Sequence, residues 1–342
     1  MEINIHSMKQ QILLLLTMII IPGSVFAQQV PLKFNLIEDL KKGRLLQDLL
    51  NEGKTDSIYG MMSDQFQKLI KGKDEFAALN NSLEPQLGKE ISLLEEASFR
   101  EAGMVSYYQI SRYEKAPSVT KRWVWKDSTI AGLSISPTIS PAATDKEFYK
   151  TKTALRLPFE GTWYTAWGGS KEYLNKHVQS GNQRFAFDFL KTENGEVLKN
   201  GKRTANSDFY SYGARVLSPG KGTVIKVVDS IQDNVLGEKN ETVPPGNHVV
   251  IDHGNGEYSF LAHFKKGSIE VVEGDQVEAG EFLGLAGNSG KSDVPHLHYH
   301  LQTGKAYNKG EGLPVQFENY VENGINVTET SPVRGYLVRP QD

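Results

Sequence analysis

Two hydrophobic periods divide the first part of the chain. From residue 34 to residue 50, leucines recur at spacings of roughly three and four, which is the spacing of a buried helix face. Phe66 and Leu69 indicate a second helix, after the glycines at 53 and 60. The segments 104–114 and 118–127 are instead rich in Val, Tyr, Trp and Thr and flank an Ala-Pro pair, which favours two antiparallel strands. Helices followed by a sheet predict a small α+β domain over residues 28–136.

The pattern changes again after residue 136. Residues 137–150 begin with PTISPAATD, which has no hydrophobic period and predicts a linker. From 151 to 342, short runs of alternating apolar residues are separated by Gly, Asn and Asp, and no long helical period is present. Many short strands with glycine-rich turns predict an all-β sandwich or barrel. Two domains also suit a chain of 342 residues.

The N-terminal segment has the pattern of a cleaved signal peptide. A lysine follows Met8, residues 12–21 form an apolar core, and a small-residue cleavage site ends at Ala27. The alternative is a membrane anchor, but this core is well short of the ~20 residues that span a bilayer. We therefore expect residues 1–27 to be removed and the mature chain to be exported to the periplasm or the exterior, without stable membrane insertion.

Charge and cysteine content narrow the possible chemistry. Lys and Arg number 38 against 41 Asp and Glu, so the net charge of −3 gives no reason to expect a nucleic-acid partner. The chain has no cysteine, which excludes disulfides, cysteine catalysis and cysteine-ligated zinc. A bound metal would have to be held by His, Asp or Glu. No feature of the sequence sets the oligomeric state.

Three of the eight histidines fall in the stretch PHLHYHLQ, at positions 296, 298 and 300. In a strand, residues i and i+2 point to the same face, about 6.6 Å apart. His296 and His298 would therefore project side by side, while the apolar residues between them face the opposite layer. One imidazole can bind a metal while its neighbour reaches a water beside that metal. The alternative is a polar strand face whose histidines are satisfied by hydrogen bonds.

Two further strands each carry an isolated polar residue. The segment RFAFDFL (184–190) alternates so that its phenylalanines form one face and Asp188 lies on the other. A carboxylate on an aromatic strand is costly unless it is paired, bound to a cation or exposed at the surface. The segment YSFLAHF (258–264) places His263 at the end of an aromatic strand, where it is either a buried structural residue or part of a site.

These segments together resemble a known family. GNHVVIDHGNGEYSFLAHF, followed by VVEGDQVEAGEFLGLAGNSGKSDVPHLHYHLQ, is similar to the lysostaphin/LytM-type zinc metallopeptidases, the M23 group, which cut peptide cross-links in bacterial cell walls. The resemblance runs from about Arg184 to Gln302 and implies a β-sandwich or barrel of the duplicated hybrid motif type. The N-terminal domain resembles, loosely and without a motif, the NTF2-like modules found beside many exported bacterial enzymes.

The resemblance also implies roles for the polar residues. Asp188 and His298 would bind zinc, while His263 and His296 would flank the attacking water, one of them as general base. Catalytic zinc sites take three protein ligands and leave one position open. An imidazole, with an ordinary pKa of about 6.5, suits the proton transfers. His253 corresponds to a turn position in the family and is expected to be structural. His300, to which the resemblance gives no role, is expected at the rim of the site.

The third zinc ligand departs from the family pattern. Most members have a histidine four residues before the aspartate, and here Arg184 takes that position. An arginine side chain has no lone pair to give to a metal, and it would pair with a carboxylate instead. A branch of the family with a similar QRFAFDF stretch carries an upstream histidine, so we expect His177 as the third ligand. His248 is the next candidate.

The predicted function is therefore an exported zinc metalloendopeptidase that hydrolyses peptidoglycan stem or cross-bridge peptides by means of a metal-activated water. A catalytically silent relative that binds or activates another cell-wall hydrolase is the alternative, and loss of several site residues would mark it. A carrier module is a third hypothesis, because the hairpins around residues 218–229 and 271–284 resemble lipoyl and biotin carriers. A carrier needs a modifiable lysine at a hairpin tip, and no convincing one is present.

Overall fold

The computed structural model describes residues 36–101 and 103–341, which form two compact units. The first unit ends at Thr138 and the second begins at Ile139. The expected signal peptide, residues 1–27, lies outside the described residues, as does the start of the first predicted domain. Among the helices of the described part, none combines the length and the apolar character needed to cross a bilayer.

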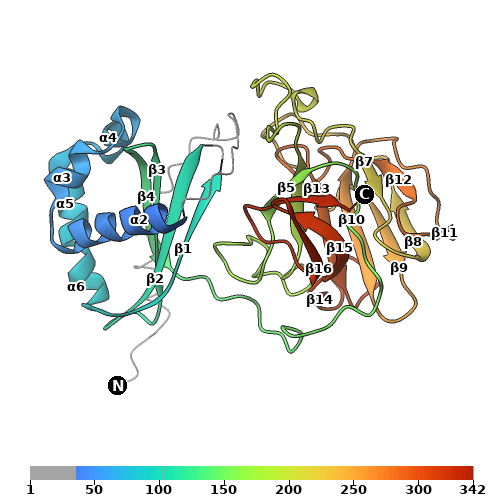
Figure 1. Ribbon diagram of the computed structural model, residues 1–342, viewed down its shortest axis with the longest axis horizontal. Coiled ribbons are helices and arrows are strands. Elements are labelled where there is room, and N and C mark those ends of the chain that lie inside the picture. Colours follow the sequence, from blue (N-terminus) through green and yellow to red (C-terminus); the bar gives the residue numbers. More distant parts are fainter. Residues whose placement is uncertain (1–35, 102, 342) are drawn as a thin grey trace. The chain divides into compact units, whose positions relative to one another are not determined.

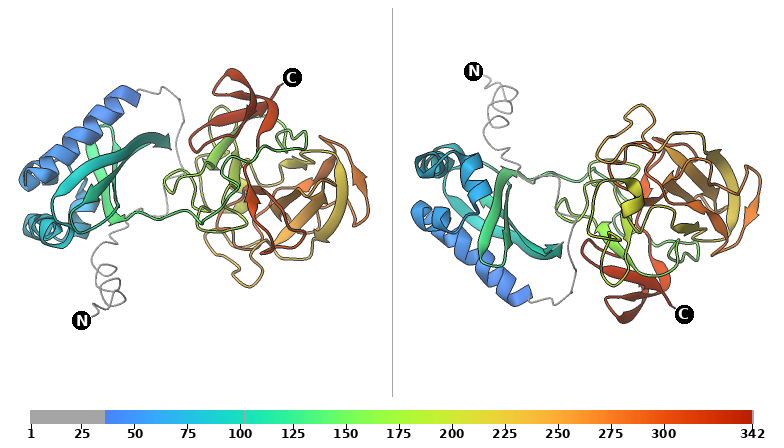
Figure 2. Two further views of the ribbon diagram at one scale, coloured as in Figure 1. Left: turned by 90° about the horizontal axis from the view of Figure 1, so that it is seen from below. Right: turned by 90° about the horizontal axis from the view of Figure 1, so that it is seen from above.

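The first unit consists of helices followed by an antiparallel meander, as the change of hydrophobic period predicts. The helices lie together on one face of a four-stranded sheet of order β1-β2-β3-β4 (Figures 1 and 2). The elements are α2 (Leu36–Asn51), α3 (Thr55–Gly60), α4 (Asp64–Ile70), α5 (Lys73–Asn81), α6 (Leu83–Leu87), β1 (Glu90–Glu101), β2 (Met104–Tyr113), β3 (Val119–Lys126) and β4 (Thr129–Pro137).

Aromatic side chains fill the core between the helices and this sheet. Trp123 and Trp125 alternate along β3 and point inward, where Phe66 of α4 and Phe76 of α5 are also fully buried. Helix α4 begins at its position because the Ser63 hydroxyl accepts a hydrogen bond from the backbone N–H of Phe66, at 3.2 Å. The α+β arrangement is thus present, and its relation to NTF2-like modules stays a resemblance.

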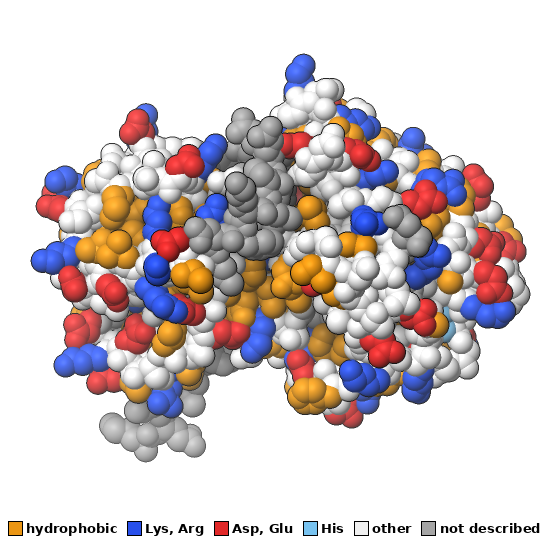
Figure 3. Space-filling model, viewed as in Figure 1, with side chains coloured by type: hydrophobic (Ala, Val, Ile, Leu, Met, Phe, Trp, Pro, Cys, Tyr) orange, Lys and Arg blue, Asp and Glu red, His pale blue; other side chains and the backbone are white. Residues whose placement is uncertain are grey.

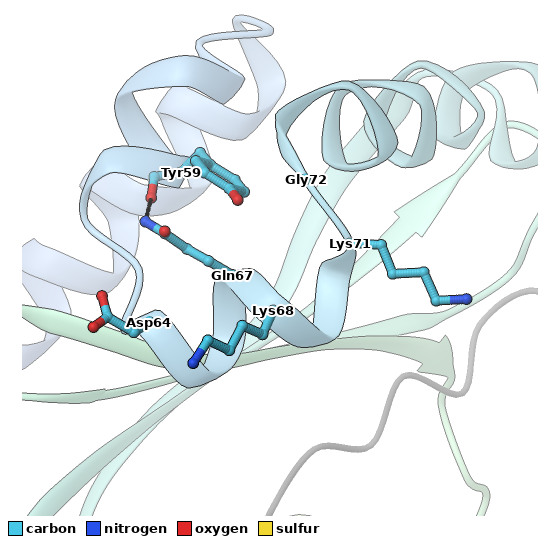
Figure 4. Close-up of a pocket in the computed structure, with 6 residues that line it drawn as sticks. All are labelled: Tyr59, Asp64, Gln67, Lys68, Lys71 and Gly72. Atoms are coloured by element: carbon cyan, nitrogen blue, oxygen red, sulfur yellow. Dashed lines mark hydrogen bonds between the residues drawn. The ribbon is translucent and has the colours of Figure 1, made fainter.

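A shallow, open hollow lies at the surface of the first unit, beside α3 and α4 (Figure 4). Gln67, one of the lining residues, donates a hydrogen bond to the carbonyl of Tyr59, at 2.9 Å. The residues that line it are Tyr59, Asp64, Gln67, Lys68, Lys71 and Gly72. None of the histidines predicted for the site lies here, so the candidate chemistry belongs to the second unit.

The second unit is built almost entirely of short antiparallel strands, and the prediction of a β fold is confirmed for this part of the chain. An 11-stranded sheet has the order β11-β8-β9-β10-β13-β6-β5-β17-β15-β16, with β14 beside β13, and β12 pairs with β7 separately. The elements are β5 (Trp163–Trp167), β6 (Phe187–Lys191), the 3-10 helix η1 (Asn206–Asp208), β7 (Arg215–Leu217), β8 (Gly222–Val228), β9 (Asn247–Asp252), β10 (Tyr258–Phe264), β11 (Gln276–Val277), β12 (Phe282–Leu285), β13 (Leu297–Gln302), β14 (Gly312–Leu313), β15 (Phe317–Glu322), β16 (Ile325–Thr330) and β17 (Leu337–Pro340).

Strands β6 and β13 lie next to each other in the middle of this sheet. Their apolar residues alternate toward the main core: Phe187 and Phe189 from β6, and Leu297, Tyr299 and Leu301 from β13. The residues between them must point to the opposite face, because side chains alternate along a strand. This second face of the sheet carries the predicted site.

Most of the predicted linker packs against the second unit. The backbone N–H of Ala142 donates to the carbonyl of Val178 at 2.7 Å, and Arg184 donates to Ala142 and to the Glu147 carboxylate. Further along, the buried Glu257 carboxylate accepts hydrogen bonds from the chain around Tyr149 to Thr153. Residues 142–153 are therefore fastened to the β unit by both backbone and side-chain hydrogen bonds.

Candidate metal centre and active site

Asp188 and His298 face each other across the paired strands β6 and β13. Their Cα atoms are directly opposite in the antiparallel register, and His298 Nδ1 lies 2.9 Å from Asp188 Oδ1. Both side chains are buried, with 3% and 5% of their residue surface exposed. The strand register alone brings these two predicted ligands together.

His177 reaches the same carboxylate from the loop between β5 and β6. Its Nε2 atom lies 3.6 Å from Asp188 Oδ1, and its ring meets the His298 ring edge to face, with centroids 5.0 Å apart. Donor atoms of these three residues all lie within 4.8 Å of one another, and they form the one such group among residues that the structure describes. His248, the next candidate for the third ligand, is outside this group, and its Nδ1 donates to the Gly246 carbonyl.

The proposed proton-transfer residues flank this group. His296 Nε2 lies 3.5 Å from Asp188 Oδ1, and the His263 ring centroid is 4.8 Å from that of His296. The two imidazoles therefore border the same small volume as the three candidate ligands.

A β-bulge places His263 there. The pairing of β10 with β9 shifts register between Ala262 and Phe264, and His263 between them has a left-handed backbone with φ of 67°. Regular alternation would point His263 into the core on the side of Leu261. The bulge instead turns His263 toward the site and sends Phe264 into the core, where it is fully buried. Alternation within the sequence could not reveal this reversal.

Asn175 fixes the orientation of the His177 ring. Its side-chain amide donates to the carbonyls of Gly169 and Ala186, each at 2.9 Å, so its Oδ1 is the acceptor. His177 Nδ1 must then donate to that oxygen, at 2.9 Å, which leaves the Nε2 lone pair directed at Asp188. Asn175 is fully buried in a loop and carries no sequence signal that marks it.

Backbone carbonyls orient the other two imidazoles in the same way. His263 Nδ1 donates to the Ser289 carbonyl at 2.8 Å, and His296 Nδ1 donates to the Val294 carbonyl at 2.8 Å. In the neutral ring, the remaining Nε2 atom then keeps its lone pair. Both rings can accept a proton at Nε2.

The electrostatic balance favours an ionised carboxylate among neutral imidazoles. Burial alone would raise the pKa of Asp188, but the Lys176 ammonium, whose Nζ lies 2.5 Å from Oδ2, and then His177 hold that pKa well below its ordinary value. Burial lowers the pKa of both His177 and His298. Metal ligands need this protonation state, because a proton on the ligand atom competes with the metal.

The donor set suits zinc. Zinc binds imidazole nitrogen and carboxylate oxygen at 2.0–2.2 Å in tetrahedral geometry, so its donors stand about 3.3 Å apart. The separations of Asp188 Oδ1 from His298 and from His177, 2.9 Å and 3.6 Å, bracket that value. Lys176 occupies the second carboxylate oxygen, so Asp188 offers one oxygen to the group.

The remaining residues singled out in the sequence lie at the edge of the site or away from it. Arg184 pairs with the carboxylate of Glu147 and contributes no ligand atom. His253 Nδ1 donates a hydrogen bond to the Lys221 carbonyl, and its Nε2 accepts one from the Ser259 hydroxyl. These bonds fasten the turn after β9.

The expectation that His300 lies at the rim is wrong. Only 2% of the residue is exposed, because its ring stacks on Phe260 of the neighbouring strand β10, with centroids 4.9 Å apart. Its Nδ1 atom lies 3.0 Å from His298 Nε2. His300 therefore sits directly behind the candidate ligand.

The site lies below the surface. On the face shown in Figure 3, acidic and basic side chains are interspersed over both units and histidine is barely visible. The side chain of Lys176, by contrast, is 47% exposed, so the loop that carries His177 is the part of the site nearest to solvent among these residues.

Curated relatives match short segments of the chain. A peptidoglycan DD-endopeptidase, ShyA, of Vibrio cholerae serotype O1 is 46% identical over 56 residues, which is 16% of this chain and 13% of the relative. A glycyl-glycine endopeptidase, ALE-1, of Staphylococcus capitis is 32% identical over 92 residues, 27% of this chain and 25% of the relative. The chain thus covers a quarter or less of the length of these relatives.

Solved structures with similarity to the chain include the catalytic domains of two other proteins. The catalytic domain of lysostaphin from Staphylococcus simulans is 20% identical, with a TM-score of 0.27, and the match covers 44% of this chain and 86% of that one. The catalytic domain of a prophage-encoded M23 protein from Enterococcus faecalis is 21% identical, with a TM-score of 0.30, over 47% and 95% of the two chains. At these scores the structural likeness adds nothing to the sequence matches.

A family model matches the second unit directly. Residues 207–309 match Peptidase family M23, a segment that contains His263, His296 and His298, whereas His177 and Asp188 precede it. The second unit of this chain therefore carries a Peptidase family M23 domain.

Proposed function

We propose that the chain is an exported zinc metalloendopeptidase that hydrolyses peptide bonds in peptidoglycan stem or cross-bridge peptides. The observation that carries this proposal is the convergence of one carboxylate and four imidazoles on a single buried point. In three of the four rings a buried amide or backbone carbonyl holds Nδ1, so that Nε2 faces the shared volume.

The residues divide into holders of the metal and carriers of protons. His177, Asp188 and His298 would hold zinc through two nitrogens and one oxygen. Zinc in that position would polarise the scissile carbonyl and lower the pKa of the attacking water. His263 and His296 would accept the proton of the attacking water and deliver one to the leaving amine, in both cases at Nε2. Burial lowers the pKa of His263 well below its ordinary value, which leaves this ring neutral and able to act as a base.

The substrate class rests on the relatives. The Vibrio cholerae relative is a peptidoglycan DD-endopeptidase and the Staphylococcus capitis relative is a glycyl-glycine endopeptidase, so both names describe cleavage of peptides. Peptidoglycan lies outside the cytoplasmic membrane, which suits the export that residues 1–27 predict. We extend the peptide-bond chemistry and the peptidoglycan substrate to this chain on that basis.

The complete site argues against a catalytically silent relative. A protein that only binds or activates another hydrolase has no need to keep both a metal-holding group and two flanking imidazoles with aligned Nε2 atoms. All of these residues are present and converge.

The test is metal analysis combined with a digest of purified peptidoglycan. The protein is expected to hold one zinc per chain and to release cleaved cross-linked peptides, detected by chromatography and mass spectrometry. Chelation should stop cleavage and added zinc should restore it. His253→Asn, which removes an imidazole from a turn outside the site, is the matched control and should cleave normally. A protein with full zinc that leaves peptidoglycan of both direct and bridged cross-link types intact would support the silent alternative.

A further inference from the structure

We propose that His300 and Gln302 form a hydrogen-bond relay that fixes the tautomer of His298, so that His298 presents Nδ1 to the metal. This proposal rests on the metal site proposed above. It assigns a positioning role to two residues behind the ligand that the family resemblance left without one.

The relay follows one face of β13. His298 Nε2 lies 3.0 Å from His300 Nδ1, and His300 Nε2 lies 3.1 Å from Gln302 Oε1. The three residues are at alternate positions, so they share the face that points away from the main core. All are buried, with 5%, 2% and 0% of their surfaces exposed, so bulk water does not compete for these bonds.

The direction of the relay is set by the carboxamide of Gln302. Its Nε2 atom lies 2.6–3.0 Å from the carbonyl oxygens of Gly304, Ala306 and Lys309. Three acceptors around one terminal atom identify that atom as the NH₂ group. The other atom, Oε1, is therefore an acceptor, and it also receives a hydrogen bond from Asn182 Nδ2 at 3.1 Å.

The donor and acceptor roles at Gln302 determine those at His300 and then those at His298. Because Oε1 of Gln302 can only accept, His300 must carry its proton on Nε2. In a neutral imidazole the other nitrogen has a lone pair, so His300 Nδ1 accepts and His298 Nε2 must donate. His298 is then left with a lone pair on Nδ1, the atom that lies 2.9 Å from Asp188 Oδ1.

The ring of His300 is held so that it cannot turn out of this line. It stacks nearly parallel on Phe260, with an angle of 11° between the planes, and Phe260 is paired directly opposite it on β10. The arrangement behind His177 has one residue fewer, because Asn175 contacts that ligand directly. The hydrogen bonds behind both candidate imidazole ligands thus lead to a buried carboxamide. His177 contacts Asn175 directly, whereas His298 is connected to Gln302 through the ring of His300.

The experiment measures zinc affinity, which does not depend on turnover. His300→Phe keeps a flat ring against Phe260 but has no acceptor for His298 Nε2–H. His300→Asn places a side-chain oxygen close to the position of Nδ1 and restores an acceptor. Loss of a hydrogen bond behind a metal ligand typically weakens metal binding by about 10–100-fold. We therefore expect that loss in His300→Phe, and at least partial recovery in His300→Asn, by competition with a chromophoric chelator.

The controls separate this inference from the proposed function. His253→Phe removes an imidazole outside the site and should bind zinc as the native protein does. Circular dichroism and thermal unfolding of each metal-free variant check the fold. If the native protein binds no zinc, the proposed function fails; if His300→Phe is folded and binds zinc with native affinity, only the relay is overturned. A folded His300→Asn that is as weak as His300→Phe would also overturn it.

Nuclear magnetic resonance of the zinc-loaded native protein gives an answer even if His300→Phe does not fold. Two-bond ¹⁵N–¹H correlations distinguish the two ring nitrogens of each histidine. The relay requires a proton on Nε2 of His298 and metal coordination at its Nδ1. A His298 that is protonated at Nδ1 and coordinated through Nε2 would contradict the proposal.

Discussion

The two sides of the candidate site are built in different ways. Asp188 and His298 come from adjacent strands, where main-chain pairing fixes their separation. His177 comes from a loop, where no ladder of backbone hydrogen bonds sets its position. Five hydrogen bonds of one buried side chain, Asn175, replace that ladder: three are donated to backbone carbonyls, and two are accepted from the backbone and ring of His177.

The difference shows what a loop needs in order to serve as a ligand. A strand supplies position through its register, so its polar residue needs only a partner that sets its tautomer. A loop needs a side chain that fixes both backbone and ring, because a ligand displaced by even a fraction of an ångström binds a metal poorly. The loop also carries the most exposed group of the site, the Lys176 ammonium.

The largest effect is expected from removing a ligand on either side. His298→Ala and His177→Ala should each lose zinc on dialysis, and cleavage should fall to background, because two protein donors hold catalytic zinc poorly. Metal content by mass spectrometry and peptidoglycan cleavage are the measurements. A His177→Ala protein with one zinc per chain would contradict the role of the loop, since the loop would then lie outside the metal site.

A smaller effect is expected from the proton-transfer residues. His263→Ala and His296→Ala should keep full zinc, while turnover falls by about 10²–10⁴-fold, the usual contribution of a general acid or base. Zinc content and the initial rate of cleavage, measured on the same preparation, test this division. Zinc loss in either variant would move that histidine into the ligand group.

Local patterns predicted the strand side of the site and little of the loop side. The alternation in RFAFDFL and PHLHYHLQ separates Asp188 and His298 from their apolar neighbours, and the structure places those neighbours in the core. That inference succeeds because the direction of a side chain in a regular strand depends on its position alone. The burial of His300 was missed because it depends on Phe260, a residue 40 positions away in the sequence.

Loop residues give no such periodic signal. His177 became a candidate through the resemblance and because Arg184 cannot bind a metal, and the structure brings it to 3.6 Å from Asp188. Asn175 and Lys176, its neighbours in the chain, could not be found in this way, because their contacts are with residues that the fold alone brings near. The bulge at His263 is likewise a property of strand pairing and not of the strand itself.

The positioning residue of the loop should matter less than the ligands. Asn175→Ala removes the partner of His177 Nδ1, so zinc affinity should fall by about 10–100-fold. It also removes the hydrogen bonds that Asn175 donates to the carbonyls of Gly169 and Ala186, which should lower the free energy of unfolding by about 1–3 kcal/mol. Chelator competition and chemical denaturation of the metal-free protein measure the two effects. Native zinc affinity in a folded Asn175→Ala protein would mean that the loop holds His177 by its backbone alone.

The smallest effect on the metal is expected from Arg184→Ala. Arg184 stands where most of the family has a ligand, yet its guanidinium points to Glu147 and to the carbonyl of Ala142, in the segment that precedes the sheet. The change should therefore leave one zinc per chain and its affinity close to native. Stability should fall, because the buried side chain of Arg184 fastens residues 142–147 to the loop that carries His177. Zinc content after dialysis and the midpoint of thermal unfolding of the metal-free protein measure the two effects. Loss of zinc without loss of the fold would show that this arginine supports the metal site itself, and the loop side would then depend on two buried side chains instead of one.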